Sequence, residues 1–161
     1  MFENIGKNLV FKYQNEKDKN FLFSLYSSTR EDELNMTLMN EVEKRAFLKQ
    51  QFDAKEFDYS TRYEDAEFLI IYRKKKAIGR VVFRITEKVH LVDIAFIKKF
   101  RSLGFGKEVL NVLISHAKQN NKPFELSVAK DNIRALKLYK KLGFQIVESY
   151  GYYYNMKLLI M

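Results

Sequence analysis

The chain has 161 residues, a formal net charge of +9, and 47% hydrophobic and 15% aromatic residues. This length predicts a single domain over residues 1–161 that buries roughly 70% of the surface of its unfolded chain, and the composition excludes a disordered protein. The sequence holds no cysteine, which excludes disulfides, thiolate metal sites and any reaction through a cysteine nucleophile.

The charged N-terminal residues and the apolar runs of the chain bear on its location. No apolar run reaches the length of a membrane-spanning helix, and the first twenty residues lack the apolar centre of a signal peptide. We therefore expect a cytoplasmic protein without a membrane partner. The two histidines are isolated in the sequence, so we expect no metal.

The N-terminal part of the chain predicts one strand followed by two helices. We expect the strand over 9–13, and Asp18 is placed as the N-cap of a helix with apolar residues at helical spacing. Asn40 and Glu43 stand three residues apart, the spacing of a capping box that opens a second helix. The stretch 51–63 holds four aromatic residues without a clean period, so we expect a helix end followed by a loop.

The middle of the chain predicts three strands. Strands over 67–72 and 77–86 flank the basic run 73–76, which is typical of the solvated turn of a hairpin. A third strand is expected over 88–97. Strict alternation along it places His90, Val92, Ile94 and Phe96 on one face and Leu91, Asp93, Ala95 and Ile97 on the other.

The third strand is followed by the run Arg101-Ser102-Leu103-Gly104-Phe105-Gly106 and then by apolar residues at helical spacing. A strand that turns through glycines into a helix leaves backbone N–H groups unpaired at the positive end of the helix dipole, where a phosphate or pyrophosphate binds. A Walker A loop is excluded because Arg101 and Glu108 replace its glycine and hydroxyl residue. A dinucleotide fingerprint is excluded because Val109 replaces its third small residue. A turn that serves only the fold remains open on this run alone.

A second segment follows the strand predicted over 124–129 and reads Asn132-x-x-Ala135-x-x-x-Tyr139-x-x-x-Gly143-Phe144. Together the two segments resemble the GNAT family of N-acetyltransferases. In that family the first motif, R/Q-x-x-G-x-G/A, is the acetyl-CoA pyrophosphate loop, and the helix of the second motif ends beside the CoA sulfur. Both motifs match at every position and in the family's order. The resemblance covers about the last hundred residues, and the chain looks most similar to bacterial members of unknown substrate.

The resemblance implies the GNAT fold, an α/β (α+β) arrangement. The family has a mixed, mostly antiparallel sheet of about six to seven strands flanked by about four helices, with a splay between the strands 90–97 and 124–129. The remaining pattern fits this plan. Gly143 is placed to end the second-motif helix, and final strands are expected over 145–149 and 152–159.

The resemblance also implies a binding site for acetyl-CoA as the co-substrate. The pantetheine arm would bind unpaired backbone groups near Ala95 like an added strand. Asn132 is predicted to be the N-cap of the second-motif helix. The resemblance implies that its side chain also contacts CoA, and one residue can have both roles. The implied donor-binding residues are Ile94, Ala95, Phe96, Arg101, Ser102, Leu103, Gly104, Phe105, Gly106, Lys107, Asn132 and Ala135.

Three residues are candidates for catalysis. Tyr139 matches the family's tyrosine that protonates the departing thiolate, although a core aromatic has the same spacing. His90 lies eleven residues before Arg101, where relatives place a glutamate or histidine that deprotonates the amine through water. Asp93 is the competing base, or it holds the acceptor's ammonium group. A chain of ordered water without any side-chain base is the remaining alternative.

We therefore predict an N-acetyltransferase that moves an acetyl group directly from acetyl-CoA to a primary amine in a ternary complex. The acceptor is left open between a small molecule and a peptide, in a groove expected along 26–37, 59–63 and 150–153. A homodimer is also left open. Two alternatives from other classes are a non-catalytic acyl-CoA-binding or regulatory module and a basic nucleic-acid-associated protein. The basic residues are interspersed with acids, so a nucleic acid is not favoured as a partner.

Overall fold

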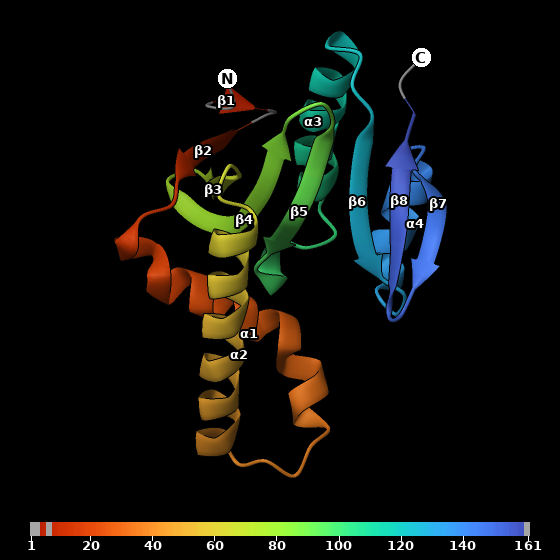
Figure 1. Ribbon diagram of the computed structural model, residues 1–161. Helices are drawn as coiled ribbons and strands as arrows, with labels where there is room; N and C mark the ends of the chain where they lie inside the picture. The colour runs from red at the N-terminus through yellow and green to blue at the C-terminus, as the bar shows by residue number, and fades with distance from the viewer. Residues whose placement is uncertain (1–3, 6–7, 160–161) are drawn as a thin grey trace.

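The structure is a computed structural model that describes residues 4–5 and 8–159. In these described residues, eight strands form one sheet in the order β1-β2-β3-β4-β5-β6-β8-β7, and four α-helices cover it (Figure 1). Every pair of neighbouring strands is antiparallel except β5 and β6, which are parallel. The mixed, mostly antiparallel sheet of the GNAT fold is confirmed. The strand beyond the predicted six to seven is β1, which has two residues.

The predicted elements are present with small shifts at their ends. The strands are β1 (Asn4–Ile5), β2 (Leu9–Tyr13), β3 (Glu67–Arg73), β4 (Lys76–Ile85), β5 (Val89–Phe96), β6 (Phe124–Ala129), β7 (Gln145–Tyr150) and β8 (Tyr153–Leu158). The α-helices are α1 (Lys19–Asn35), α2 (Glu41–Arg62), α3 (Phe105–Gln119) and α4 (Ile133–Lys141), and the short 3-10 helices are η1 (Glu16–Asp18) and η2 (Lys98–Phe100).

The sheet separates two layers of helices. On one face, Leu22 of α1 and Phe52 of α2 pack against Ile70 of β3. On the other face, α3 and α4 pack on Leu69 and Ile71, the neighbours of Ile70, to form the larger core. Because successive side chains of a strand point to opposite faces, this arrangement places the α1–α2 pair and the α3–α4 pair on opposite sides of the sheet.

The loop predicted within 51–63 is wrong, because α2 continues without a break to Arg62. Its start is as predicted: the Asn40 side chain accepts from the Glu43 N–H at 2.9 Å in a capping box. The helical period is obscured later because the face of α2 that meets the sheet carries Glu56 and Tyr59, one charged and one polar residue, where an amphipathic pattern requires apolar side chains.

Strands β5 and β6 pair over only three residues each. Val89, His90 and Leu91 lie opposite Phe124, Glu125 and Leu126, and the ladder continues no further. Figure 1 shows the two strands diverging from there toward the end of the sheet at which α3 begins. The predicted splay is therefore present, and it leaves the second half of β5 without a neighbour on the β6 side.

A β-bulge interrupts β5 just before the splay. Phe83 of β4 lies opposite Leu91, but Val82 lies opposite Asp93, so Val92 has no partner in the β4 ladder. An extra residue of this kind bends the strand and shifts the side-chain alternation by one position.

The bulge corrects the predicted faces of β5. Residues opposite one another in a ladder share a face, and Ala95 lies opposite Arg80, which in turn lies opposite Ile70 on the α1–α2 face. His90 and Asp93 therefore lie on this same face, whereas strict alternation predicted opposite faces for them. Leu91, Ile94 and Phe96 lie on the α3–α4 face with the main core.

Candidate functional site

The loop before α3 has the geometry of an anion site. Ser102 and Gly104 both have positive φ, +60° and +91°, which turns the chain sharply between η2 and α3. Gly104 is the N-cap and supplies no side-chain hydrogen bond to the helix. The first-turn N–H groups of α3 are therefore left for an external acceptor, at the positive end of the helix dipole.

Arg101 braces this loop. Its Nε donates to the Phe96 carbonyl oxygen at 2.8 Å, and its Nη2 donates to Ser28 Oγ of α1 at 2.9 Å. Burial lowers the pKa of Arg101, and the positive charge of Arg134 lowers it further. A guanidinium has five N–H donors, so these two bonds leave donors for a phosphate. Arg101 thus joins the end of β5 to the loop and to α1.

The open side of β5 presents backbone groups of Ile94 and Phe96. The Ile97 N–H donates to the Ile78 carbonyl oxygen of β4 at 2.9 Å. Hydrogen-bonded pairs alternate along an antiparallel ladder, so Ala95 also bonds toward β4, and the groups of Ile94 and Phe96 point toward the splay. The Phe96 carbonyl oxygen accepts from Arg101 Nε. The Phe96 N–H faces the splay, where β6 does not pair with it. The ladder therefore turns the Phe96 N–H, and not the Ala95 N–H, toward the splay.

Tyr139 lies on α4 and is buried, with 6% of its surface exposed. Burial raises its pKa to about 12, and the negative charge of Asp93 raises it in the same direction. The phenol therefore keeps its proton at neutral pH and can donate it. Its ring also meets the Phe144 ring at 5.9 Å, so the packing role of a core aromatic is present, and the catalytic role stays a prediction.

The ends of α4 position Tyr139. The Asn132 side chain caps the helix by accepting from the Ala135 N–H at 3.3 Å, which is the predicted N-cap role. Gly143, with φ of +104°, follows the last turn and allows the chain to reverse into β7. Both motif residues therefore fix the length and direction of the helix that carries the phenol.

His90 lies at the closed end of the splay, opposite Glu125 of β6. Its ring meets the Tyr63 ring edge-on at 5.6 Å. Burial lowers the pKa of His90, and the charges of Lys88 and Arg84 lower it further. His90 is therefore a neutral imidazole at neutral pH, able to accept a proton.

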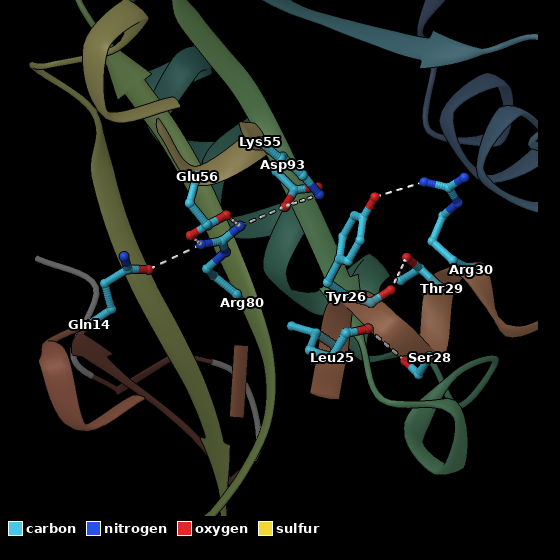
Figure 2. A network of polar contacts seen from close by, with 10 residues as sticks. All are labelled: Gln14, Leu25, Tyr26, Ser28, Thr29, Arg30, Lys55, Glu56, Arg80 and Asp93. Atoms are coloured by element: carbon cyan, nitrogen blue, oxygen red, sulfur yellow. Dashed lines mark hydrogen bonds and ion pairs between the residues drawn. The ribbon is translucent and has the colours of Figure 1, made fainter. Parts of the chain in front are cut away.

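Asp93 joins a cluster of charged side chains beneath the α1–α2 layer (Figure 2). Arg80, 3% exposed, forms a bidentate pair with Glu56 of α2 at 2.5 and 2.9 Å and contacts Gln14 Oε1 at 3.3 Å. Asp93 lies 3.4 Å from Arg80 Nη2 and 3.6 Å from Lys55 Nζ. The geometry thus places a carboxylate of β5 on the α1–α2 face, beside the splay and within the electrostatic reach of Tyr139.

Sequence reasoning did not identify Lys55, Glu56 and Arg80. Arg80 could have been found, because it interrupts an otherwise apolar strand between Gly79 and Val81. Lys55 and Glu56 carry no comparable signal, since they stand among charged residues of a helix whose period is obscured. Their importance depends on the packing of α2 against β4 and β5.

A cavity of about 530 Å³ lies between α1 and α2, and part of its α1 lining belongs to the stretch 26–37 predicted for the acceptor. Ser27, Ser28 and Glu31 of α1 line it, together with Lys44 and Arg45 of α2. Through Ser28 it adjoins Arg101.

The described part of the chain contains neither a metal-binding cluster nor a membrane-spanning helix. No cluster of three or more His, Asp or Glu side chains in residues 4–5 and 8–159 could hold a metal ion. None of the helices there is long and apolar enough to cross a membrane.

Known proteins resemble this chain in sequence and in fold. The model of the acetyltransferase (GNAT) family matches residues 24–144. An N-alpha-acetyltransferase of Sulfurisphaera tokodaii is 36% identical over 72 residues, which span 44% of this chain and 43% of that protein. The match therefore covers less than half of the length of this curated relative.

Two solved structures share the fold. The PaiA N-acetyltransferase of Thermoplasma acidophilum, in complex with coenzyme A, has a TM-score of 0.70 at 16% identity and covers 95% of this chain and 99% of its own. Naa50 of Arabidopsis thaliana, in complex with the bisubstrate analogue CoA-Ac-MVNAL, has a TM-score of 0.60 at 18% identity and covers 94% and 98%.

The family match extends over most of the chain and includes the splay, the loop before α3 and the helix of Tyr139. The predicted N-acetyltransferase with acetyl-CoA as co-substrate is thereby confirmed at the level of the family. The chain belongs to the GNAT family of acetyltransferases, the enzymes that use acetyl-CoA to acetylate amines.

Proposed function

We propose that this protein transfers an acetyl group directly from acetyl-CoA to a primary amine while both are bound. The observation that carries the proposal is the splay of β5 from β6, bordered by the uncapped start of α3 and by the phenol of Tyr139. A loop suited to the phosphates of the acetyl donor, an unpaired strand edge and a buried phenol that can donate a proton adjoin one another there.

The donor would lie along the splay. The pyrophosphate would bind the N–H groups at the start of α3 and the remaining donors of Arg101, with Asn132 beside CoA. The pantetheine amides would pair with the open backbone of Ile94 and Phe96 like an added strand. A backbone N–H of this open edge would then stabilise the negative charge that develops on the thioester oxygen.

The chemical step would be one displacement. The neutral amine attacks the thioester carbonyl carbon and forms the C–N bond, and the tetrahedral oxyanion then collapses and breaks the C–S bond. The proton of Tyr139 goes to the departing CoA sulfur. The attacking nitrogen loses a proton to His90 through water, to Asp93, or to water alone.

The acceptor would approach from the α1–α2 face, where Asp93 and His90 lie. The similarity to an N-alpha-acetyltransferase supports a primary amine of a peptide or a small molecule.

Thermal unfolding with acetyl-CoA, CoA and ATP tests the donor site. A ligand of the folded state at a hundred times its dissociation constant adds about 2.7 kcal/mol, or roughly 5–10 °C for a domain of this size. We expect a shift of this order with acetyl-CoA and CoA and a much smaller one with ATP. Release of free thiol with a panel of primary amines then tests turnover, with no protein cysteine to add background.

Donor binding without turnover on any amine would favour a non-catalytic acyl-CoA-binding module. The absence of any shift with acetyl-CoA would contradict the proposed function altogether.

A further inference from the structure

Asp93 is held loosely for a buried carboxylate. Only 18% of its side chain is exposed, yet the described residues give it just two contacts, at 3.4 Å to Arg80 and 3.6 Å to Lys55. Glu56, by contrast, holds the same arginine at 2.5 and 2.9 Å. A carboxylate accepts about four hydrogen bonds. Asp93 therefore has the capacity for a closer cationic donor than the structure supplies.

Lys55 occupies an aromatic site around this carboxylate. Its Nζ lies 5.1 Å from the centre of the Tyr26 ring and 5.4 Å from that of the Tyr59 ring, within the range of cation–π contacts. Figure 2 shows Lys55 beside Asp93, with Tyr26 next to them. An unbranched alkylammonium of this chain thus already fits a site made of one carboxylate and two phenol rings.

The charges at this site balance only because Lys55 is present. Arg80 and Glu56 neutralise each other through their bidentate pair. Asp93 is then matched by Lys55, whose side chain is 30% exposed and can turn out to solvent. Without the lysine ammonium the site would carry one unmatched negative charge, which suits a single monovalent cation.

The site lies where an acceptor would meet the donor. Asp93 stands one residue before Ile94, whose backbone faces the splay, and its side chain is on the α1–α2 face.

On the basis of the proposed function, we propose that Asp93, Tyr26 and Tyr59 form the subsite for the acceptor's ammonium group, and that Lys55 fills it until an acceptor displaces it. The ligand class is a primary ammonium on an unbranched alkyl chain, because the occupant whose ammonium lies over the two rings is the unbranched side chain of Lys55. The bound ammonium then passes one proton to His90 through water, to Asp93 or to water, and the neutral nitrogen attacks the thioester.

Binding of n-butylammonium to the acetyl-CoA-free protein tests this subsite. Lys55→Met removes the resident charge but keeps an unbranched stem, so we expect the dissociation constant to fall about fivefold relative to wild type. Lys55→Arg leaves a cation that binds a carboxylate more closely, so we expect weaker binding than wild type. Ligand-observed NMR titration measures each constant, and thermal unfolding checks that each variant is folded.

Lys49→Met is the matched control. Lys49 also lies on α2, pairs with Asp53 at 3.1 Å and sits over the Phe23 and Phe52 rings, but away from Asp93. This variant should bind n-butylammonium as wild type does. The uncharged 1-butanol should bind all variants alike, and the double variant Lys55→Met with Asp93→Asn should lose the gain of Lys55→Met.

The subsite is overturned if Lys55→Met binds n-butylammonium no more tightly than wild type does, or if Lys55→Arg binds it more tightly. The ligand class is overturned if sec-butylammonium, branched at the carbon that bears nitrogen, binds Lys55→Met better than the linear amine does. Because these titrations need no acetyl-CoA, they separate the subsite from the proposed function, which the acetyl-CoA shift and thiol release test.

Discussion

Burial shifts the pKa values of Tyr139 and His90 in opposite directions, and both shifts favour the neutral form. The phenol of Tyr139 has its pKa raised to about 12, and the imidazole of His90 has its pKa lowered. At neutral pH the site therefore holds one group that can donate a proton and one that can accept a proton. Direct acetyl transfer needs both, since the thiolate gains a proton and the amine loses one.

Replacing Tyr139 with phenylalanine should lower kcat by about ten- to a thousandfold, because only the proton donor is removed and the CoA thiolate is itself a fair leaving group. The ring packing against Phe144 is kept, so the melting temperature should change little. Single-turnover rates, where chemistry limits, give the measurement. A rate equal to that of wild type would contradict the role of Tyr139.

The pH dependence of kcat/KM tests His90. A lowered pKa means that the imidazole stays unprotonated to below the ordinary value of about 6.5. The acid limb of the profile should therefore have its midpoint below that value, and His90→Ala should remove this limb with a loss of about a hundredfold or more.

The free energy of unfolding should depend on pH through His90 in the same direction as kcat/KM does, so that it decreases as the pH falls. The unfolded state binds the proton more readily, so the contribution of the buried neutral imidazole is present above about pH 6.5 and is lost as the pH falls toward the folded-state pKa. An unchanged profile and rate in His90→Ala would leave Asp93 or water as the base.

At the scale of elements, the pairing of α2 with β4 decides how the acceptor face is built. The helix lies across the sheet, and Arg80 is its buried point of attachment through Glu56. Because Arg80 is 3% exposed, it cannot turn to water if its partner is lost. The pair therefore fixes where Lys55 and Tyr59, one turn apart on the same helix, meet Asp93.

Glu56→Gln should destabilise the protein by about 3 kcal/mol, because it leaves a buried guanidinium without its main anionic partner. Asp58→Asn is the matched control. It makes the same change two residues further along α2, in an exposed pair with Arg62, and should leave the free energy of unfolding nearly unchanged. Denaturant unfolding measures both, and equal losses would refute the attachment through Arg80.

At the scale of the whole molecule, the sheet divides the proposed donor and acceptor sites. The start of α3 and the helix of Tyr139 belong to the α3–α4 layer, whereas Asp93 and the charged cluster lie under α1 and α2. The splay is the place where the sheet opens between the two layers. In the proposed function, two ligands would meet there without one having to leave first.

This separation predicts sequential kinetics. Double-reciprocal plots of the initial rate against the acetyl-CoA concentration, at several amine concentrations, should intersect, because both substrates must be bound before transfer. Parallel lines would indicate a covalent acetyl-enzyme and would rule out direct transfer. The absence of cysteine from the chain leaves no thiol to carry such an intermediate.

Much of the donor side could be predicted because its parts are local in sequence. Gly104 and Gly106 at a strand-to-helix turn, Asn132 three residues before Ala135, and Gly143 after the last helical turn each act on their immediate neighbours. Turn and cap geometry depends on a few adjacent residues, so such patterns predict both the element and its end. The assignment of side-chain roles to these residues stays a prediction.

The acceptor side could not be predicted in this way. The bulge at Val92 depends on how β4 and β5 align, and it moves His90 and Asp93 to the same face against strict alternation. The pair of Arg80 with Glu56 joins residues 24 positions apart.

The amino-acid sequence by itself determined the family, the order of the elements and the donor loop, because these depend on composition and on short-range spacing. Only the tertiary structure decided the extent of the splay, the faces of β5 and the neighbours of Asp93. Strand register and helix-to-sheet packing are set by many long-range contacts together, and no local pattern in the chain contains them.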